Sequence, residues 1–314
     1  MNKKWYSIIN IIIQNAILNE AEDQQITLSE RIKKLLRNKK FRRLMTSELS
    51  KAKKSFAGMA GSNLDHLYVQ CGLEADSLEK LRCRHWHLKA QGIQELAILD
   101  RKEAFNEIYQ LTNDSNEQVR MEAQNAVVEL SGFEGLKFLD FLTYALSDWQ
   151  QINLLNKLGE PTELATSYIG NWLSSKNNSV AIFSLKLASK LHDFELHEKV
   201  LQCITHPNSS VRYHAIHSLK EIYTEETAKK LIIQYENEDL HNKLAILEVL
   251  QVIGTDDNIQ FLLEQFEQEN NLIKIKSGRA IADIEGITKL ENSALMSIYP
   301  WSVIIQQIKV EKAA

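Results

Sequence analysis

Cysteine and histidine side chains recur at two places where their spacing would permit metal binding. Two histidines three residues apart lie on one face of a helix, as a pair of zinc ligands requires. Structural zinc sites usually contain paired Cys motifs, and this sequence has none. We therefore expect no metal, and we expect the cysteines to be small buried hydrophobic residues. The residues concerned are Cys203, His206, His214 and His217 in one group and Cys83, His85 and His87 in the other.

Glycines come close together at Gly58–Gly61, as they do in phosphate-binding loops. The segment lacks the Lys-Ser/Thr of a nucleotide-binding loop, and no strand-like run precedes it, as a dinucleotide fingerprint would require. We expect a loop between two helices, with the second helix ending at Gly72. No catalytic triad follows elsewhere, so the sequence predicts a protein that is not an enzyme and has no cofactor or small-molecule substrate.

The elements that would position these side chains are helices that recur in an internal repeat. A polar start at Asn116 leads to Val119-Arg120 and then to small and apolar residues at helical spacing, and the phrase returns from Asn208 through Val211-Arg212. We take this arginine as the index residue of each repeat and step along the chain by about 31 residues. The seven index residues are Lys89, Arg120, Gln151, Ala181, Arg212, Lys243 and Lys274, and five of them are basic.

Apolar residues keep the same register over the whole repeat. The position seven after each index residue is apolar in all seven repeats, and the position ten after it is apolar except at Pro161, which would end its helix early. A second apolar-periodic segment, such as Ile259–Phe266, separates successive index helices. Each repeat is therefore predicted to be a helix pair, and we expect the index cations to hold neighbouring loops and repeats together.

The second helix of the pair opens with Asn-x-x-Val-Arg-x-x-Ala-x-x-Ala-Val at 116–127. This helix pair resembles the HEAT repeat of the short bacterial type. The resemblance covers roughly residues 70–286, and Gln150-Gln151 and Ala181 depart from it. It implies an all-α fold, a right-handed α-solenoid of stacked helix pairs that binds a protein partner. Stacking is also a physical requirement, because one helix pair cannot bury its own apolar face.

Three regions are expected along the chain. Residues 1–70 form a basic helical region, in which Thr27-Leu28-Ser29-Glu30 spells a capping box ahead of a helix. Residues 71–286 hold the seven repeats, and residues 287–314 close the solenoid with a helix over Ile287–Ile298, a break at Pro300 and a last helix.

The charge is divided very unevenly. Residues 31–54 carry net +10, and the total of −4 leaves −14 for the rest. Such a segment needs a counter-charge, from anionic lipid, nucleic-acid phosphate or an acidic protein surface. Because Trp5, Tyr6 and an isoleucine run lie just ahead, we favour an anionic membrane surface. The candidate surface-binding residues are Arg31, Lys33, Lys34, Arg37, Lys39, Lys40, Arg42 and Arg43.

The outward face of the second helices is expected at positions two, five, eight and nine after each index residue. It holds five basic residues against six acidic ones, among them Glu122 and Glu129, which does not make a phosphate-binding track. A HEAT-like nucleic-acid protein of the repair-glycosylase type is therefore the alternative, and a scaffold for a protein partner is favoured. The candidate partner-binding residues on this face are Phe183, His214, His217, Lys220 and Val252.

The cysteine content and the first apolar run bear on location. Three widely spaced cysteines argue against a secreted disulfide framework, so we expect the cytoplasm. The apolar run from Trp5 to Leu18 is interrupted by polar residues and is shorter than the roughly 20 residues that span a bilayer. We expect a protein that is peripheral to the inner membrane, or one anchored there by a membrane segment ahead of this chain.

Overall fold

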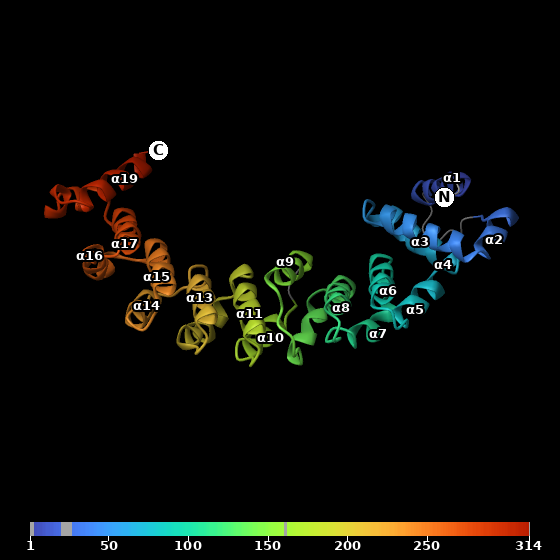
Figure 1. The fold of residues 1–314 in the computed structure, drawn as a ribbon, viewed down its shortest axis with the longest axis horizontal. Coiled ribbons are helices and arrows are strands. Elements are labelled where there is room, and N and C mark those ends of the chain that lie inside the picture. Colours follow the sequence, from blue (N-terminus) through green and yellow to red (C-terminus); the bar gives the residue numbers. More distant parts are fainter. Residues whose placement is uncertain (1–2, 20–26, 160–161, 314) are drawn as a thin grey trace. The chain divides into compact units, whose positions relative to one another are not determined.

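The structure, a computed structural model, describes residues 3–19, 27–159 and 162–313 (Figure 1). Within these ranges the regular structure is entirely helical and no strand is present. The chain is an all-α solenoid of stacked helix pairs, as the repeat predicts. It divides into two compact units, Met1–Thr162 and Glu163–Ala314, which we describe one at a time. The boundaries expected at 70/71 and 286/287 stay predictions.

The first unit begins with four helices around a core of their own: α1 (Lys3–Ile17), α2 (Glu30–Leu36), α3 (Lys39–Lys53) and α4 (Gly58–Gln70). α1 packs against α3 and α4 because its isoleucines recur at helical spacing on one face. Ile9 and Ile13 are buried there with Phe41, Met45 and Leu67. No helix in the described part of the chain is long and apolar enough to cross a membrane.

Three local expectations for this region were wrong. The cationic segment 31–54, expected to be a single helix, is two helices. Asn38 follows the first helix and caps α3 by accepting hydrogen bonds from the Lys40 and Phe41 amides. The N-cap of α2 is Ser29, whose hydroxyl accepts from the Ile32 amide, and not Thr27. Gly58–Gly61 is the first turn of α4 and not a loop.

The remainder of the first unit holds three helix pairs. The first element of one pair, η2 (Gly132–Asp140), is a 3-10 segment, whereas the sequence predicts an α-helix there. α9 ends at Lys157, and the predicted break at Pro161 lies outside the described residues. The pairs are α5 (Glu74–Leu81) with α6 (Trp86–Ile98), η1 (Lys102–Ala104) and α7 (Phe105–Tyr109) with α8 (Glu117–Ser131), and η2 (Gly132–Asp140) with α9 (Asp148–Lys157).

The second unit holds four pairs and a terminal segment. Neighbouring second helices pack directly on one another, α11 on α13, α13 on α15 and α15 on α17. The pairs are α10 (Ala165–Trp172) with α11 (Asn178–Lys190), η3 (Phe194–Leu196), α12 (His197–Gln202) and η4 (Cys203–Thr205) with α13 (Ser209–Ser218), α14 (Thr227–Tyr235) with α15 (Leu240–Ile253), and η5 (Asp256–Asn258) and α16 (Ile259–Phe266) with α17 (Asn271–Ile284).

The register of the repeat is confirmed at every second helix. Each of the seven index residues is the fourth residue of its helix. Six of these helices begin after an Asn, Asp or Ser whose side chain accepts a hydrogen bond from the first turn, as Asn116 accepts from the Val119 amide. The position seven after the index is buried in six repeats and half-buried at Leu158.

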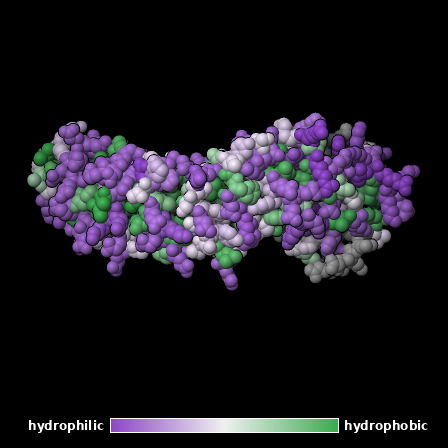
Figure 2. All heavy atoms as spheres, turned by 90° about the horizontal axis from the view of Figure 1, so that it is seen from below, coloured by the Kyte–Doolittle hydropathy of each residue, from purple (hydrophilic) through white to green (hydrophobic). Residues whose placement is uncertain are grey.

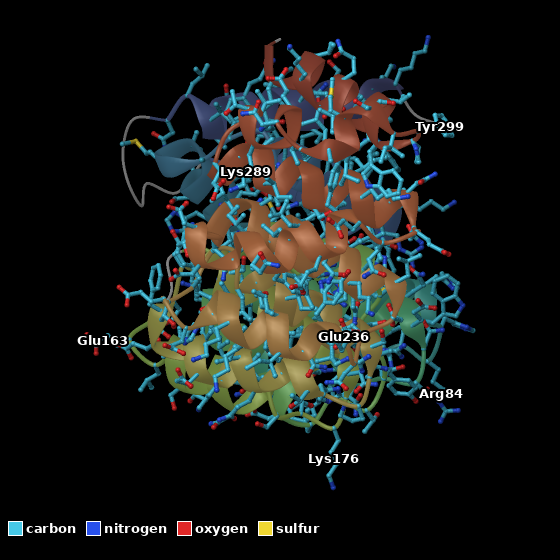
Figure 3. All side chains as sticks on the ribbon, turned by 90° about the vertical axis from the view of Figure 1, so that its left-hand side faces the viewer. Arg84, Glu163, Lys176, Glu236, Lys289 and Tyr299 are labelled. Atoms are coloured by element: carbon cyan, nitrogen blue, oxygen red, sulfur yellow. The ribbon has the colours of Figure 1, made fainter. Side chains whose placement is uncertain are left out.

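The C-terminal segment closes the stack with α18 (Thr288–Glu291), η6 (Ala294–Ser297) and α19 (Trp301–Ala313). The single helix expected over Ile287–Ile298 is therefore wrong, whereas the break and the last helix are confirmed. α19 buries Ile305 and Ile308 and packs on α17. Tyr299, 82% exposed, projects from the turn between η6 and α19 (Figure 3).

Candidate interaction surfaces

The index residues hold each second helix to the loop before it. Arg120 donates from Nη1 to the carbonyl oxygens of Asp114 (2.6 Å) and Ser115 (3.3 Å), and Arg212 donates to those of His206 and Pro207 in the same way. These carbonyls lie five and six residues before the index, so the contact follows from the repeat itself. The expectation that the index cations are structural is confirmed.

The departures from the repeat have different consequences. Gln151 Nε2 donates to the Leu146 carbonyl, five residues earlier, at 3.2 Å, and so replaces the arginine contact without its charge. Lys274 Nζ likewise reaches the Glu269 carbonyl at 3.2 Å and lies 4.1 Å from the centre of the Trp301 ring. Ala181 is fully buried and has no such group.

Arg212 also joins two repeats through a buried carboxylate. Its Nε lies 2.8 Å from Glu238, whose side chain is completely buried and also accepts hydrogen bonds from Gln234 and Asn242. The Glu238 contact raises the pKa of Arg212 above its ordinary value. A buried carboxylate is stable only when its oxygens are paired in this manner.

The predicted cationic surface divides into paired and unpaired side chains. Arg42 makes two hydrogen bonds to Asp76 on α5, at 2.6 and 2.9 Å, and this pairing lowers the pKa of Asp76. Lys39 pairs with Glu79 at 2.7 Å and Lys33 with Glu30 at 2.8 Å. The other five are exposed and make no ion pair with a described residue: Arg31, Lys34, Arg37, Lys40 and Arg43.

Trp5 does not reach a surface as the sequence suggests. Its partly buried ring packs edge-on against Phe41 with centroids 5.6 Å apart, against the core that α1 shares with α3 and α4. The aromatic ring is therefore used for packing within the N-terminal region. Any contact of α2 and α3 with an anionic surface must depend on charge.

The five residues predicted to bind a partner are not all accessible. Phe183 is fully buried, so its predicted outward position is wrong. The reason is that α11 is flanked by α10 and α13, which leaves a solvent strip narrower than the one expected. His214 and His217 are half-buried, Lys220 is exposed and Val252 is 54% exposed.

His214 and His217 lie in an aromatic group on α13 and α15. Tyr213 stacks on His241 with centroids 4.2 Å apart and contacts His217 at 4.5 Å. The Nε2 atom of His217 is buried and has no hydrogen-bond partner among the described residues. Burial lowers the pKa of His217 below 6.5, and Lys220 lowers it further.

We expect this histidine to make the protein less stable in mild acid. The unfolded chain binds a proton near pH 6.5 and the folded chain only at lower pH, so stability is lost as the pH falls from 6.5 towards the lowered pKa. His217→Phe should reduce the difference between urea midpoints measured at pH 7.5 and pH 5.5. An unchanged difference would contradict the role of His217.

The structure does not bring together either of the two Cys and His groups whose spacing would permit a metal. No cluster of three or more His, Cys, Asp or Glu side chains suited to a metal is found where residues are described. Cys203 is buried, which raises its pKa to about 11, and His206 Nδ1 instead accepts a hydrogen bond from the Asn208 amide at 3.1 Å. In the other group, the His85 and His87 rings are exposed.

A cavity of about 260 Å³ opens on the second-helix side of the first unit, and the sequence analysis did not predict it. It is lined by residues of α6, α8 and α9 and by Lys54, which follows α3. Ala97, Ile98 and Ala126 supply its apolar lining, and Glu122 is half-buried at it. The charges at facing positions of α6 and α8 could have indicated the cavity, since neutral Gln94 lies on α6 where a cation to pair with Glu122 is expected.

The described surface is otherwise polar. In the face drawn in Figure 2, apolar side chains form small separate groups among hydrophilic ones. In the second unit, the exposed side chains of Lys176 and Glu236 mark the loops that join the two helices of a pair (Figure 3). Isolated exposed apolar residues are normal on protein surfaces.

Solved structures similar to this chain include the following three. An engineered protein is 15% identical with a TM-score of 0.41, covering 89% of this chain and 87% of that one. Human deoxyhypusine hydroxylase in complex with glycerol is 13% identical with a TM-score of 0.36, covering 90% and 97%. The CpcE–CpcF complex of phycocyanin lyase from Nostoc is 12% identical with a TM-score of 0.28, covering 94% and 98%. Scores this low carry no argument about function.

The sequence comparisons bear directly on the family. No curated protein matches the chain. The family of HEAT repeats matches residues 197–282, which span α12 to α17 and contain three index residues. The same helix pair, with its index residue fourth in the second helix, is found in both units. Residues 197–282 of the chain are therefore HEAT repeats.

Proposed function

We propose that this protein is a non-enzymatic scaffold that holds a protein partner on its second helices and attaches to an anionic membrane surface through α2 and α3. The observation that carries the attachment is the set of five exposed cations on these two helices, Arg31, Lys34, Arg37, Lys40 and Arg43. Anionic lipid headgroups supply the counter-charge that the described residues do not. Such an attachment places the protein at the cytoplasmic face of the membrane.

The second-helix surface supports protein binding better than nucleic-acid binding. Three of its cations are already paired with carboxylates of adjacent helices: Lys276 pairs with Glu248, Arg279 with Glu311 at 2.7 Å, and Lys157 with Glu129 at 2.6 Å. A phosphate backbone would have to displace these carboxylates. The same surface exposes Val252 near the end of α15 and Lys220 close to His217 of the aromatic group, a mixture typical of protein interfaces.

Affinity capture with the full chain tests this function. Wild-type protein should recover a protein from the membrane fraction of the native cell, and Val252→Glu should lose it. Ile233→Glu is the matched control, because Ile233 is 64% exposed on α14, a first helix of its pair. Recovery of nucleic acid alone, or equal recovery of the protein by Val252→Glu, would refute the proposal.

A further inference from the structure

An ion pair joins the adjacent second helices α15 and α17 at two facing positions of the repeat. Lys276, two residues after its index, pairs with Glu248, five residues after the index of the preceding helix. The same two positions face each other between α8 and α6. On α8, Glu122 lies two residues after the index, and on α6, Gln94 lies five residues after the index. Glu122 has no hydrogen bond or ion pair to a described residue. The ion pair found between α15 and α17 therefore has no counterpart between α6 and α8.

The cavity of about 260 Å³ lies at this place. Both Gln94 and Glu122 line it, together with the amide of Asn125 and the unpaired ammonium group of Lys54. Lys157 and Glu129, which also line it, already pair with each other at 2.6 Å. The cavity thus presents one unused carboxylate and one unused ammonium group beside an apolar lining of Ala97, Ile98 and Ala126.

We propose that this cavity binds a C-terminal arginine of the protein partner. The guanidinium pairs with Glu122, the aliphatic part of the side chain lies on the alanines and Ile98, and the terminal carboxylate pairs with Lys54. A guanidinium offers a planar set of donors that suits a carboxylate flanked by amide oxygens, here Gln94 and Asn125. The cavity is smaller than the roughly 300–1,000 Å³ of drug-sized sites, which fits a single long residue.

This inference rests on the proposed function, because it specifies how the partner is recognised. Its test uses short probes and needs no knowledge of the partner. Binding of acetyl-Gly-Arg with a free carboxylate is measured by calorimetry with the full chain. Two altered peptides serve as comparisons: one has a C-terminal amide, and the other has neutral citrulline in place of arginine. Each should bind at least about tenfold more weakly, since each loses one charged contact.

Two variants locate the binding. Glu122→Gln should abolish the preference for arginine over citrulline, and Lys54→Gln should abolish the preference for the free carboxylate over the amide. Glu117→Gln and Lys102→Gln, exposed positions in the same unit outside the cavity, should keep both preferences. Circular dichroism checks that all four variants are folded.

The proposal is overturned if acetyl-Gly-Arg does not bind, or if Glu122→Gln keeps the preference for arginine. Either result would leave the capture experiment with Val252→Glu unaffected, because Val252 lies in the other unit. Conversely, selective binding of the probe with no protein recovered in that experiment would refute the proposed scaffold and leave the cavity as a peptide site.

Discussion

Replacing Arg31, Lys34, Arg37, Lys40 and Arg43 together with glutamine should weaken binding to phosphatidylserine-containing vesicles by about a hundredfold or more. A cation near an anionic membrane contributes about 1 kcal/mol, and each factor of ten in affinity corresponds to about 1.4 kcal/mol. All five side chains are exposed and lack an ion pair to a described residue, so the substitution breaks no described internal salt bridge. Vesicle co-sedimentation at several salt concentrations measures the effect.

The salt dependence and a matched variant separate local attachment from net charge. Wild-type binding should fall steeply as salt increases and should be absent with phosphatidylcholine alone, because Trp5 packs against Phe41 and insertion is not expected. A control variant removes five exposed lysines elsewhere, namely Lys102, Lys176, Lys229, Lys230 and Lys309. Equal losses in the two variants would contradict a specific role for α2 and α3.

Arg212→Ala should lower the free energy of unfolding by about 3–5 kcal/mol, the usual loss when one partner of a buried ion pair is removed. The substitution leaves Glu238, whose side chain is completely buried, with two amide donors and no cation. It also frees the carbonyls of His206 and Pro207 from their donor. Urea denaturation followed by circular dichroism measures the loss.

Two further variants show whether the unpaired carboxylate is the cause. Arg82→Ala removes an arginine that pairs with Glu107 at 2.7 Å on the exposed surface, and it should leave the unfolding midpoint nearly unchanged. Adding Glu238→Gln to Arg212→Ala should restore part of the stability, because the buried charge is then absent. If the double variant is no more stable than Arg212→Ala, the carboxylate is not responsible.

The repeat could be read from the sequence because it depends on local physics. An Asn, Asp or Ser N-cap, a cation in the first turn and an apolar residue seven positions later recur in most of the second helices, and these signals lie within one helix. Gln151 shows that even a departure can keep its function, since its amide reaches the carbonyl five residues earlier, as Arg120 also does in its own repeat. Phe183 shows the limit, because its burial depends on the helices on either side of α11.

The sequence alone determined that the chain is a stack of helix pairs, where the second helix of each pair begins, and that one end is strongly cationic. Tertiary structure decided which cations remain available, since Arg42 and Lys39 meet Asp76 and Glu79 on a helix more than thirty residues away. It also decided that Glu122 faces a cavity without a partner. Helix formation follows from neighbours in sequence, whereas pairing and burial follow from neighbours in space, and no local pattern specifies those.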